Sequence, residues 1–97
     1  MPLKVEVHPE AVAEAEAAKL WYEARSHKAA HGFLAELDRA IEQISNAPDR
    51  WPNYLHGTRR FLLRRYPFSI VYRQVGNSID LVAVAHARRK PGYWASR

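Results

Sequence analysis

Two consecutive segments with helical character, separated only by a short polar join, most limit what this chain can fold into. Residues 9–25 are rich in Ala, Glu and Leu, which are good helix formers, and Pro9 suits the first turn of a helix. Residues 27–46 carry apolar side chains at helical spacing, namely Phe33, Leu34, Leu37, Ile41 and Ile44. Because Ser26 is a favoured N-cap residue and the join is short, we predict two antiparallel helices.

Strand patterns flank the two helices. Residues 3–7 alternate apolar and polar side chains. Three further strands are predicted over residues 59–65, 68–74 and 78–86. Gly76-Asn77 predicts a tight turn before the last strand, which is apolar on both faces, as interior strands are. The order β-α-α-β-β-β predicts one α+β domain over residues 1–97, with the helical hairpin packed on an antiparallel sheet. The other face of the sheet is expected to be free for function.

The composition limits the chemistry of the protein and the cellular compartment in which we expect it. The chain has no cysteine, which excludes disulfides, a thiolate nucleophile and a Cys-based zinc site. No apolar run approaches the roughly 18–20 residues that span a bilayer, and residues 1–10 lack the pattern of a secretory signal. We therefore expect a cytoplasmic protein with no membrane partner.

Charge is distributed unequally along the chain. Residues 1–49 contain five Lys or Arg and nine Asp or Glu, a net charge of −4. Residues 50–97 contain ten Lys or Arg and a single acid, Asp80, a net charge of +9. This asymmetry points to an anionic partner for the second half, either nucleic acid or an acidic protein segment. The alternative is that the acidic helices neutralise the basic sheet within one fold.

The basic residues of the second half come from neighbouring predicted strands and from the segment after the last one. Because alternate residues of a strand share a sheet face, several of these side chains should meet on one surface. Guanidinium groups bind phosphate and carboxylate through paired hydrogen bonds, which predicts an anion-binding face. The alternative is a solvated edge whose charges prevent aggregation. The residues expected to form the functional surface are Arg60, Arg64, Arg73, Arg88 and Arg89.

Side chains capable of chemistry follow the last predicted strand. His86 precedes Arg88 by two residues, and a titratable group beside a phosphate-binding one suits general acid or base catalysis on RNA. The alternative is a histidine at the rim that is hydrogen-bonded to backbone. Tyr93 and Trp94 either stack on a nucleic-acid base or close a small core.

The remaining acidic residues and histidines predict no metal or cofactor site. We interpret Glu10, Glu14 and Glu16 as an exposed acidic helix face rather than a catalytic carboxylate set. His27 and His31 have the i, i+4 spacing of a metal-binding pair, but no third ligand is evident. The chain also has no phosphate-binding loop, dinucleotide-binding fingerprint or Ser-centred elbow.

Four segments resemble toxins of the RelE/ParE superfamily, the toxin halves of bacterial type II toxin–antitoxin pairs, often described as plasmid stabilisation proteins. The segments are residues 8–26, 33–52, 59–73 and 83–94, of which "YPFSIVYR" and "AVAHARRKPGYW" are the most specific. The resemblance covers about residues 5–95 and implies the fold predicted above. It also implies a cognate antitoxin, whose segment is disordered alone and wraps the toxin on binding. An acidic antitoxin segment would suit the basic half of this chain.

The two branches of the superfamily differ in activity. The RelE branch cleaves mRNA on the ribosome without a metal. By position, Arg89, or Arg88 if the register slips, would match its phosphate-contacting Arg, and Arg65, His86 and Tyr93 would complete the set. However, Phe68 stands near where that branch carries a basic residue, and an apolar ring neither binds phosphate nor moves a proton.

The ParE branch lacks the nuclease set and acts on DNA gyrase. The segment "HARRKPGYW" is more similar to this branch than to the nucleases. The resemblance therefore implies a growth-inhibiting toxin that acts by binding rather than by covalent chemistry, with DNA gyrase and the antitoxin as partners. One alternative is a ribosome-dependent mRNA endonuclease, with the ribosome and mRNA in place of gyrase. Another is a non-toxic relative that acts only as a binding module.

Overall fold

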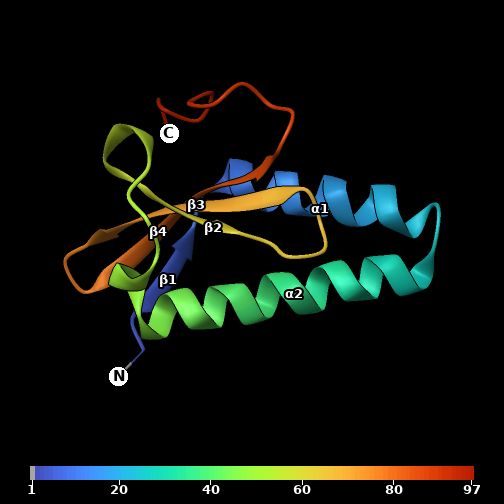
Figure 1. Cartoon of the computed structure of the whole chain (residues 1–97), viewed down its shortest axis with the longest axis horizontal. Helices are drawn as coiled ribbons and strands as arrows, with labels where there is room; N and C mark the ends of the chain where they lie inside the picture. Colours follow the sequence, from blue (N-terminus) through green and yellow to red (C-terminus); the bar gives the residue numbers. More distant parts are fainter. Residues whose placement is uncertain (1) are drawn as a thin grey trace.

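The computed structural model describes residues 2–97 and has the element order predicted from the sequence (Figure 1). The elements are β1 (Lys4–Val7), α1 (Pro9–Glu23), α2 (His27–Asn46), the short 3-10 helices η1 (Pro48–Arg50) and η2 (Leu55–Gly57), β2 (Arg59–Leu62), β3 (Phe68–Val75) and β4 (Ser78–His86). The strands form a single sheet in the order β1-β4-β3-β2. No helix within residues 2–97 is long and apolar enough to cross a membrane.

The sheet is mixed. The predicted antiparallel meander is confirmed, because β2 pairs with β3 and β3 with β4 in antiparallel fashion. The N-terminal strand β1 adds to the other side of β4 in parallel. The last strand, β4, is therefore an interior strand, as its apolar centre predicts.

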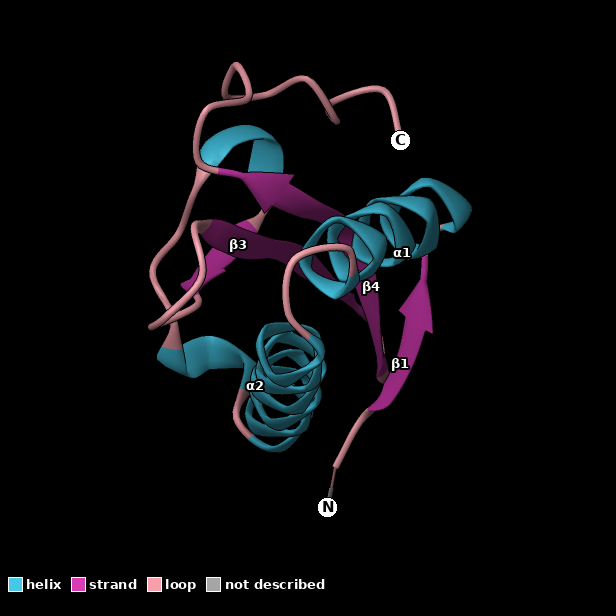
Figure 2. Cartoon of the chain, turned by 90° about the vertical axis from the view of Figure 1, so that its right-hand side faces the viewer, coloured by secondary structure: helices cyan, strands magenta, loops and turns pink. Residues whose placement is uncertain are grey.

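The two helices pack as a hairpin against one face of the sheet (Figure 2). As predicted, Ser26 caps α2, and its Oγ accepts a hydrogen bond from the Ala29 N–H at 3.1 Å. The apolar face of α2 supplies large buried side chains, whereas α1 buries the small side chains of Ala11 and Ala18. Small side chains let α1 approach β4 closely. The core between helices and sheet includes Phe33, Leu37, Ile44, Ile70, Tyr72 and Ile79.

An aromatic cluster closes the core where the helices extend past the sheet. Phe33, Tyr66 and Phe68 lie together, with ring centroids 5.4–5.5 Å from Phe33 to each of the other two. The Tyr66 hydroxyl donates a hydrogen bond to the Ala29 carbonyl at 2.7 Å. A β-carbon at position 32 of α2 would collide with that hydroxyl, so a larger residue there would displace the Tyr66 side chain.

The second face of the sheet is not free, contrary to the expectation from the sequence. Trp94, which is only 2% exposed, packs against Val71, Val82 and Ala83 on that face. Tyr54 packs against Trp94 with ring centroids 5.9 Å apart and the ring planes tilted by 38°. Figure 1 shows the C-terminal segment passing over the sheet on the side away from α2. The physical reason is that β4 is apolar on both faces, so both need cover.

A β-bulge in β4 reverses which side chains face the helices. Val71 lies opposite Ala83 and Tyr72 opposite Leu81, so Val82 is an extra residue in β4. Val82 and Ala83 consequently both pack on the second face, whereas Val84 returns to the core on the helix side. After the bulge, the His86 ring lies against Phe68, with centroids 5.0 Å apart.

The strand β2 is shorter than predicted, ending at Leu62 instead of at residue 65. The backbone N–H groups of Arg64 and Arg65 both donate to the Glu36 carboxylate of α2, the second at 3.0 Å. The chain therefore leaves the sheet toward α2, and both arginines lie in the loop between β2 and β3.

Ionisation of the Tyr72 hydroxyl should lower the free energy of unfolding at alkaline pH. Its side chain is fully buried, its hydroxyl donates to the Pro48 carbonyl at 2.6 Å, and burial raises its pKa to about 12 despite the nearby Arg59 charge. The folded protein thus holds this proton more tightly than the unfolded chain. The corresponding stabilisation, roughly 3 kcal/mol, is complete below about pH 10 and lost as the pH rises to about 12.

Urea unfolding of the wild type and of Tyr72→Phe between pH 8 and 12 checks this expectation. The variant should lose about 1 kcal/mol at pH 8, where it lacks the hydrogen bond, yet decline less steeply above pH 10. Parallel pH profiles for the two proteins would show that another group causes the alkaline loss.

Candidate functional site

The segment after β4 forms a compact turn held by backbone hydrogen bonds. The Ala87 N–H donates to the Pro67 carbonyl at 2.7 Å, and the Arg89 N–H donates to the His86 carbonyl at 3.0 Å. The Arg88 N–H donates to His86 Nδ1 at 3.0 Å, which fixes the orientation of that ring. We refer to residues 87–91 as the basic turn, because it contains Arg88, Arg89 and Lys90.

One acidic side chain anchors the C-terminal segment to α1. Glu14, whose side chain is 15% exposed, accepts hydrogen bonds from the Tyr93 hydroxyl at 2.6 Å and from the Val84 N–H at 3.0 Å. The Arg97 guanidinium donates to both Glu14 oxygens, at 2.9 and 3.1 Å, and Arg89 lies 3.8 Å away. Hydrogen bonds between ionised groups are stronger than neutral ones. Glu14 therefore holds the end of the chain against α1 and β4.

Glu14 and Arg97 also cover an open edge of β4. The strand β1 pairs with β4 only as far as Leu81, so the following residues have no strand neighbour on that side. There, Glu14 accepts the Val84 N–H, and Arg97 donates to the Val82 carbonyl at 3.2 Å. The two side chains thus satisfy backbone groups that a neighbouring strand would otherwise bind.

The Tyr93 hydroxyl is already engaged in a hydrogen bond with Glu14. Burial raises the pKa of Tyr93 well above its ordinary value, and the hydrogen bond to Glu14 raises it further. The hydroxyl therefore keeps its proton at neutral pH and already donates it to Glu14. It is poorly placed to transfer a proton to a substrate.

Two pockets lie on either side of a wall formed by His86, Arg89 and Tyr93. The first, the apolar pocket, has a volume of about 400 Å³ and is lined by Trp21, Tyr22, Phe68, Pro67 and Val84, among others. The second, the basic pocket, has a volume of about 80 Å³ and lies on the other face of the sheet. Its lining includes Arg60, Ser69, Lys90, Tyr54 and Trp94.

The structure assembles the five-arginine surface predicted from the sequence only in part. Arg60 and Arg89 line the basic pocket, and Arg88 is exposed on the basic turn beside it. Arg73 lies elsewhere, 3.7 Å from Asp80, and donates to the Arg97 carbonyl at 3.1 Å. The structure therefore brings Arg60, Arg88 and Arg89 together at the basic pocket, whereas Arg73 lies farther along the sheet, beside Asp80.

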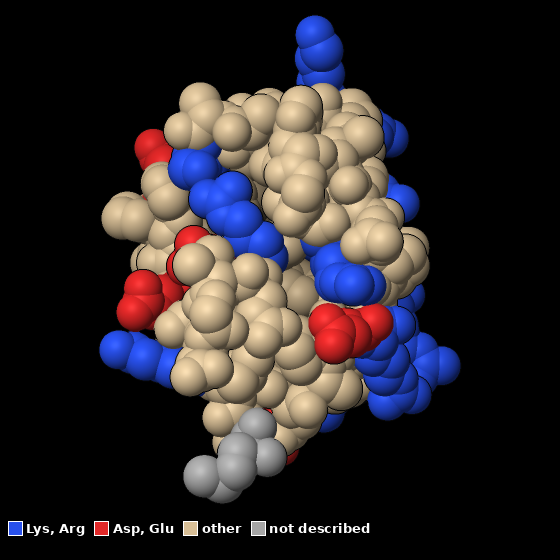
Figure 3. Space-filling view, turned by 90° about the vertical axis from the view of Figure 1, so that its left-hand side faces the viewer, with Lys and Arg blue, Asp and Glu red and all other residues tan. Residues whose placement is uncertain are grey.

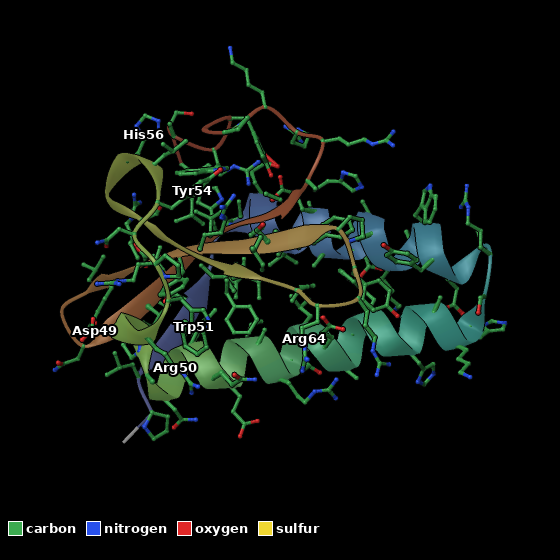
Figure 4. All side chains as sticks on the ribbon, in the orientation of Figure 1. Asp49, Arg50, Trp51, Tyr54, His56 and Arg64 are labelled. Atoms are coloured by element: carbon green, nitrogen blue, oxygen red, sulfur yellow. The ribbon has the colours of Figure 1, made fainter. Side chains whose placement is uncertain are left out.

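Arg64 is separated from the others because β2 ends before it. Figure 4 shows Arg64 beside α2, whereas Tyr54 and His56 lie on the side of the C-terminal segment. The Arg64 N–H bonds to Glu36, while Tyr54 and His56 contact Trp94, in agreement with this separation.

Part of the basic charge is neutralised within the molecule. Arg59 lies 4.0 Å from Asp49, and Arg73 and Arg97 pair with Asp80 and Glu14. On the face shown in Figure 3, basic and acidic side chains are interspersed rather than gathered in one basic patch. Some of the positive charge of residues 50–97 is thus paired within the molecule, whereas Arg60 and Lys90 in the basic pocket form no ion pair with the described residues.

The residues of the nuclease alternative are likewise only partly brought together. His86, Arg89 and Tyr93 line both pockets, but Arg65 lies in the loop between β2 and β3, with its N–H bonded to Glu36. Within residues 2–97 there is no group of three or more His, Asp or Glu side chains that could hold a metal ion.

Sequence reasoning missed Glu14 as the anchor of the site and treated it as part of an exposed acidic face. Glu10 and Glu16 are indeed exposed, but Glu14 is not. The signal was available, because Glu14 lies three residues after Ala11 and four before Ala18, on the buried face of α1. No comparable signal pointed to Arg97, whose role depends on where the chain end folds back.

Comparison with known proteins agrees with this architecture. The family model described as "ParE toxin of type II toxin-antitoxin system, parDE" matches residues 5–91. A solved structure titled "Chromosomal ParDE TA system from P. aeruginosa" has the same fold, with a TM-score of 0.77 at 19% sequence identity. The match covers 89% of this chain and 97% of that chain. No curated protein matches the sequence. Because the family model spans most of the chain, this protein belongs to the ParE toxin family and is the toxin component of a type II toxin–antitoxin system.

Proposed function

We propose that this toxin inhibits growth by binding DNA gyrase, with the basic turn and Arg60 as its contact surface, and that it uses no covalent chemistry. The observation that carries the binding mechanism is the hydrogen bond from the Tyr93 hydroxyl to Glu14 at 2.6 Å. A nuclease needs a group free to transfer a proton and a cation beside the reacting phosphate. Here the tyrosine is occupied, and Arg65 lies in a different loop.

The choice of gyrase as the target is supported by membership of the ParE family and by the similarity of the segment "HARRKPGYW" to that branch. The cytoplasm is then the compartment in which the toxin meets its target. The cognate antitoxin is proposed to offer an acidic segment, because residues 50–97 carry a net charge of +9. Such a segment would compete with gyrase for the exposed cations of the basic turn.

Expression of the toxin alone in bacteria tests the target. We expect filamentous cells with an induced DNA-damage response, and the purified toxin should inhibit supercoiling by gyrase. Rapid arrest of translation with mRNA cut at the ribosomal A site would instead establish the nuclease alternative. Unimpaired growth would contradict toxicity altogether.

Removing two charges from the basic turn should relieve toxicity. In Arg88→Ala with Arg89→Ala, we expect gyrase inhibition to weaken at least tenfold, because hydrogen bonds from charged groups contribute about 1.5–3 kcal/mol each. Arg89 is 53% exposed, so its loss should reduce stability little. The midpoint of thermal unfolding checks that the variant stays folded.

A matched double variant, Lys28→Ala with Arg39→Ala, removes two exposed cations of α2, away from the basic turn. It should inhibit gyrase as the wild type does. Equal toxicity of both double variants and the wild type would place the contact surface elsewhere on the molecule.

A further inference from the structure

The basic pocket has the features of a binding site for one small anion. Three cations, Arg60, Arg89 and Lys90, line a space of about 80 Å³ whose wall also includes the buried Ser69. We propose that this pocket binds a single anionic head group, a phosphate or a carboxylate carried by a partner molecule. The inference concerns the ligand chemistry of the pocket, and it does not depend on gyrase being the target.

The two guanidinium groups are held in place before any ligand arrives. Arg60 lies over the Tyr54 ring with its Cζ 4.2 Å from the centroid, and Arg89 lies over Tyr93 at 3.7 Å. A guanidinium stacked on an aromatic face keeps its N–H groups pointing outward in its plane, where they can bind an anion bidentately. Binding therefore costs less side-chain entropy than it would for freely moving arginines.

The walls of the pocket are closely packed as well. Tyr54 and His56 both pack on Trp94, with ring centroids 5.9 and 5.8 Å away. Gly92 adopts a φ of +85°, and a β-carbon there would lie 3.2 Å from His56 Nε2. The loop around η2 and the C-terminal segment are thus fitted against each other, which fixes the distance between Arg60 and the basic turn.

Most of the cations that line the basic pocket have no acidic partner within the protein. Among residues 2–97, no carboxylate lies within 4.0 Å of the Arg60 or Lys90 side chain, and Arg89 reaches Glu14 only at 3.8 Å. By contrast, the partly buried Arg59, Arg73 and Arg97 all contact acidic residues of the chain. Cations gathered in a polar pocket without a counterion attract an anion from outside.

The size of the pocket limits the ligand to a head group. A water molecule occupies about 30 Å³ in the liquid, so about 80 Å³ holds two or three waters. A phosphate or carboxylate group fits such a space, whereas a nucleobase does not. The rest of the partner molecule must therefore remain outside.

Two titrations of the isotope-labelled toxin at constant ionic strength test the site, one with inorganic phosphate and one with N-acetylglutamate. We expect NMR shift changes at the Arg60 side-chain Nε–H and at the amides of Arg89 and Lys90, with none at Arg73. Response to phosphate alone would identify phosphate groups as the ligand, and response to the carboxylate alone would identify acidic protein segments. Absence of a saturable response to either anion would overturn the proposal.

Variants then locate the binding. Arg60→Ala and Lys90→Ala should each weaken anion binding by roughly tenfold, whereas Arg73→Ala, on the same sheet but paired with Asp80, should leave it unchanged. Arg60→Lys keeps the positive charge but lacks the paired N–H groups of a guanidinium, so it should show an intermediate loss of anion affinity. This variant tests the site even if Arg60→Ala disturbs folding. An equal loss in Arg73→Ala would show only diffuse attraction to the basic half and would also overturn the site. Anion affinity is measured without gyrase. A negative result in the gyrase assay would therefore not affect the test of the anion site.

Discussion

Replacing Glu14 with alanine is expected to lower the free energy of unfolding by about 3–5 kcal/mol, because it leaves a partly buried arginine without its counterion. Arg97, whose side chain is 15% exposed, would lose both of its hydrogen bonds to carboxylate oxygens. The Val84 N–H and the Tyr93 hydroxyl would lose their acceptor at the same time. A domain of this size has a total stability of only about 5–15 kcal/mol, so the loss should be large relative to the whole.

Chemical denaturation followed by circular dichroism measures this loss, and Glu10→Ala and Glu16→Ala are matched controls on the same helix. Both control residues are exposed, and each substitution should change stability by less than about 0.5 kcal/mol. Glu14→Gln retains acceptor capacity without the charge, so its stability should fall between wild type and Glu14→Ala. If Glu14→Ala cost no more than the controls, the hydrogen-bonded anchor would contribute nothing to stability.

The same substitution should affect function beyond its effect on folding. Glu14 holds Tyr93, and Tyr93 supports the Arg89 guanidinium at 3.7 Å in the wall of the basic pocket. When the anchor is lost, the basic turn should become more mobile, and hydrogen exchange at Val84 should accelerate more than at core amides of β3. Glu14, a residue of α1 that stabilises the fold, therefore also positions the surface that we propose for target binding.

Much of the fold could be predicted from the sequence because its signals are local. The Ser26 cap, the apolar face of α2 and the turn at Gly76 each depend on residues close in sequence, and the structure confirms all three. The parallel addition of β1 to β4 could not be predicted in the same way, because it joins residues more than seventy positions apart. Coverage of the second face by Trp94 depends likewise on how the chain end folds back.

The site was harder to predict because one extra residue changes which face each side chain occupies. Strict alternation from Leu81 would place the side chains of Val84 and His86 on the second face. The bulge at Val82 places Val84 in the helix-side core and the His86 ring against Phe68 instead. The early end of β2 separates Arg64 from Arg60 for a similar reason, since Glu36 binds the backbone after Leu62. Alternation predicts neighbours only while a strand remains regular.

Replacing Trp94 with alanine is the second change expected to have a large effect, a loss of about 3–5 kcal/mol. The indole is 2% exposed and packs on Val71, Val82 and Ala83, which would become accessible to water. Tyr54 and His56 would lose the ring against which they pack, so the wall of the basic pocket should loosen as well. The variant should therefore bind anions more weakly than the wild type even at temperatures where it is fully folded.

Trp21→Ala provides a matched control, because it removes the same side chain from a position that is 54% exposed. It should cost less than about 1 kcal/mol and leave anion binding unchanged. Urea denaturation of both variants, with NMR titration at low temperature, separates the two outcomes. If the two tryptophan variants proved equally stable, the helix-side core alone would sustain the fold, and the C-terminal segment would be a dispensable cover. If Trp94→Ala is much less stable, the sheet requires packing on both faces, and the segment that carries the basic turn is part of the core that supports it.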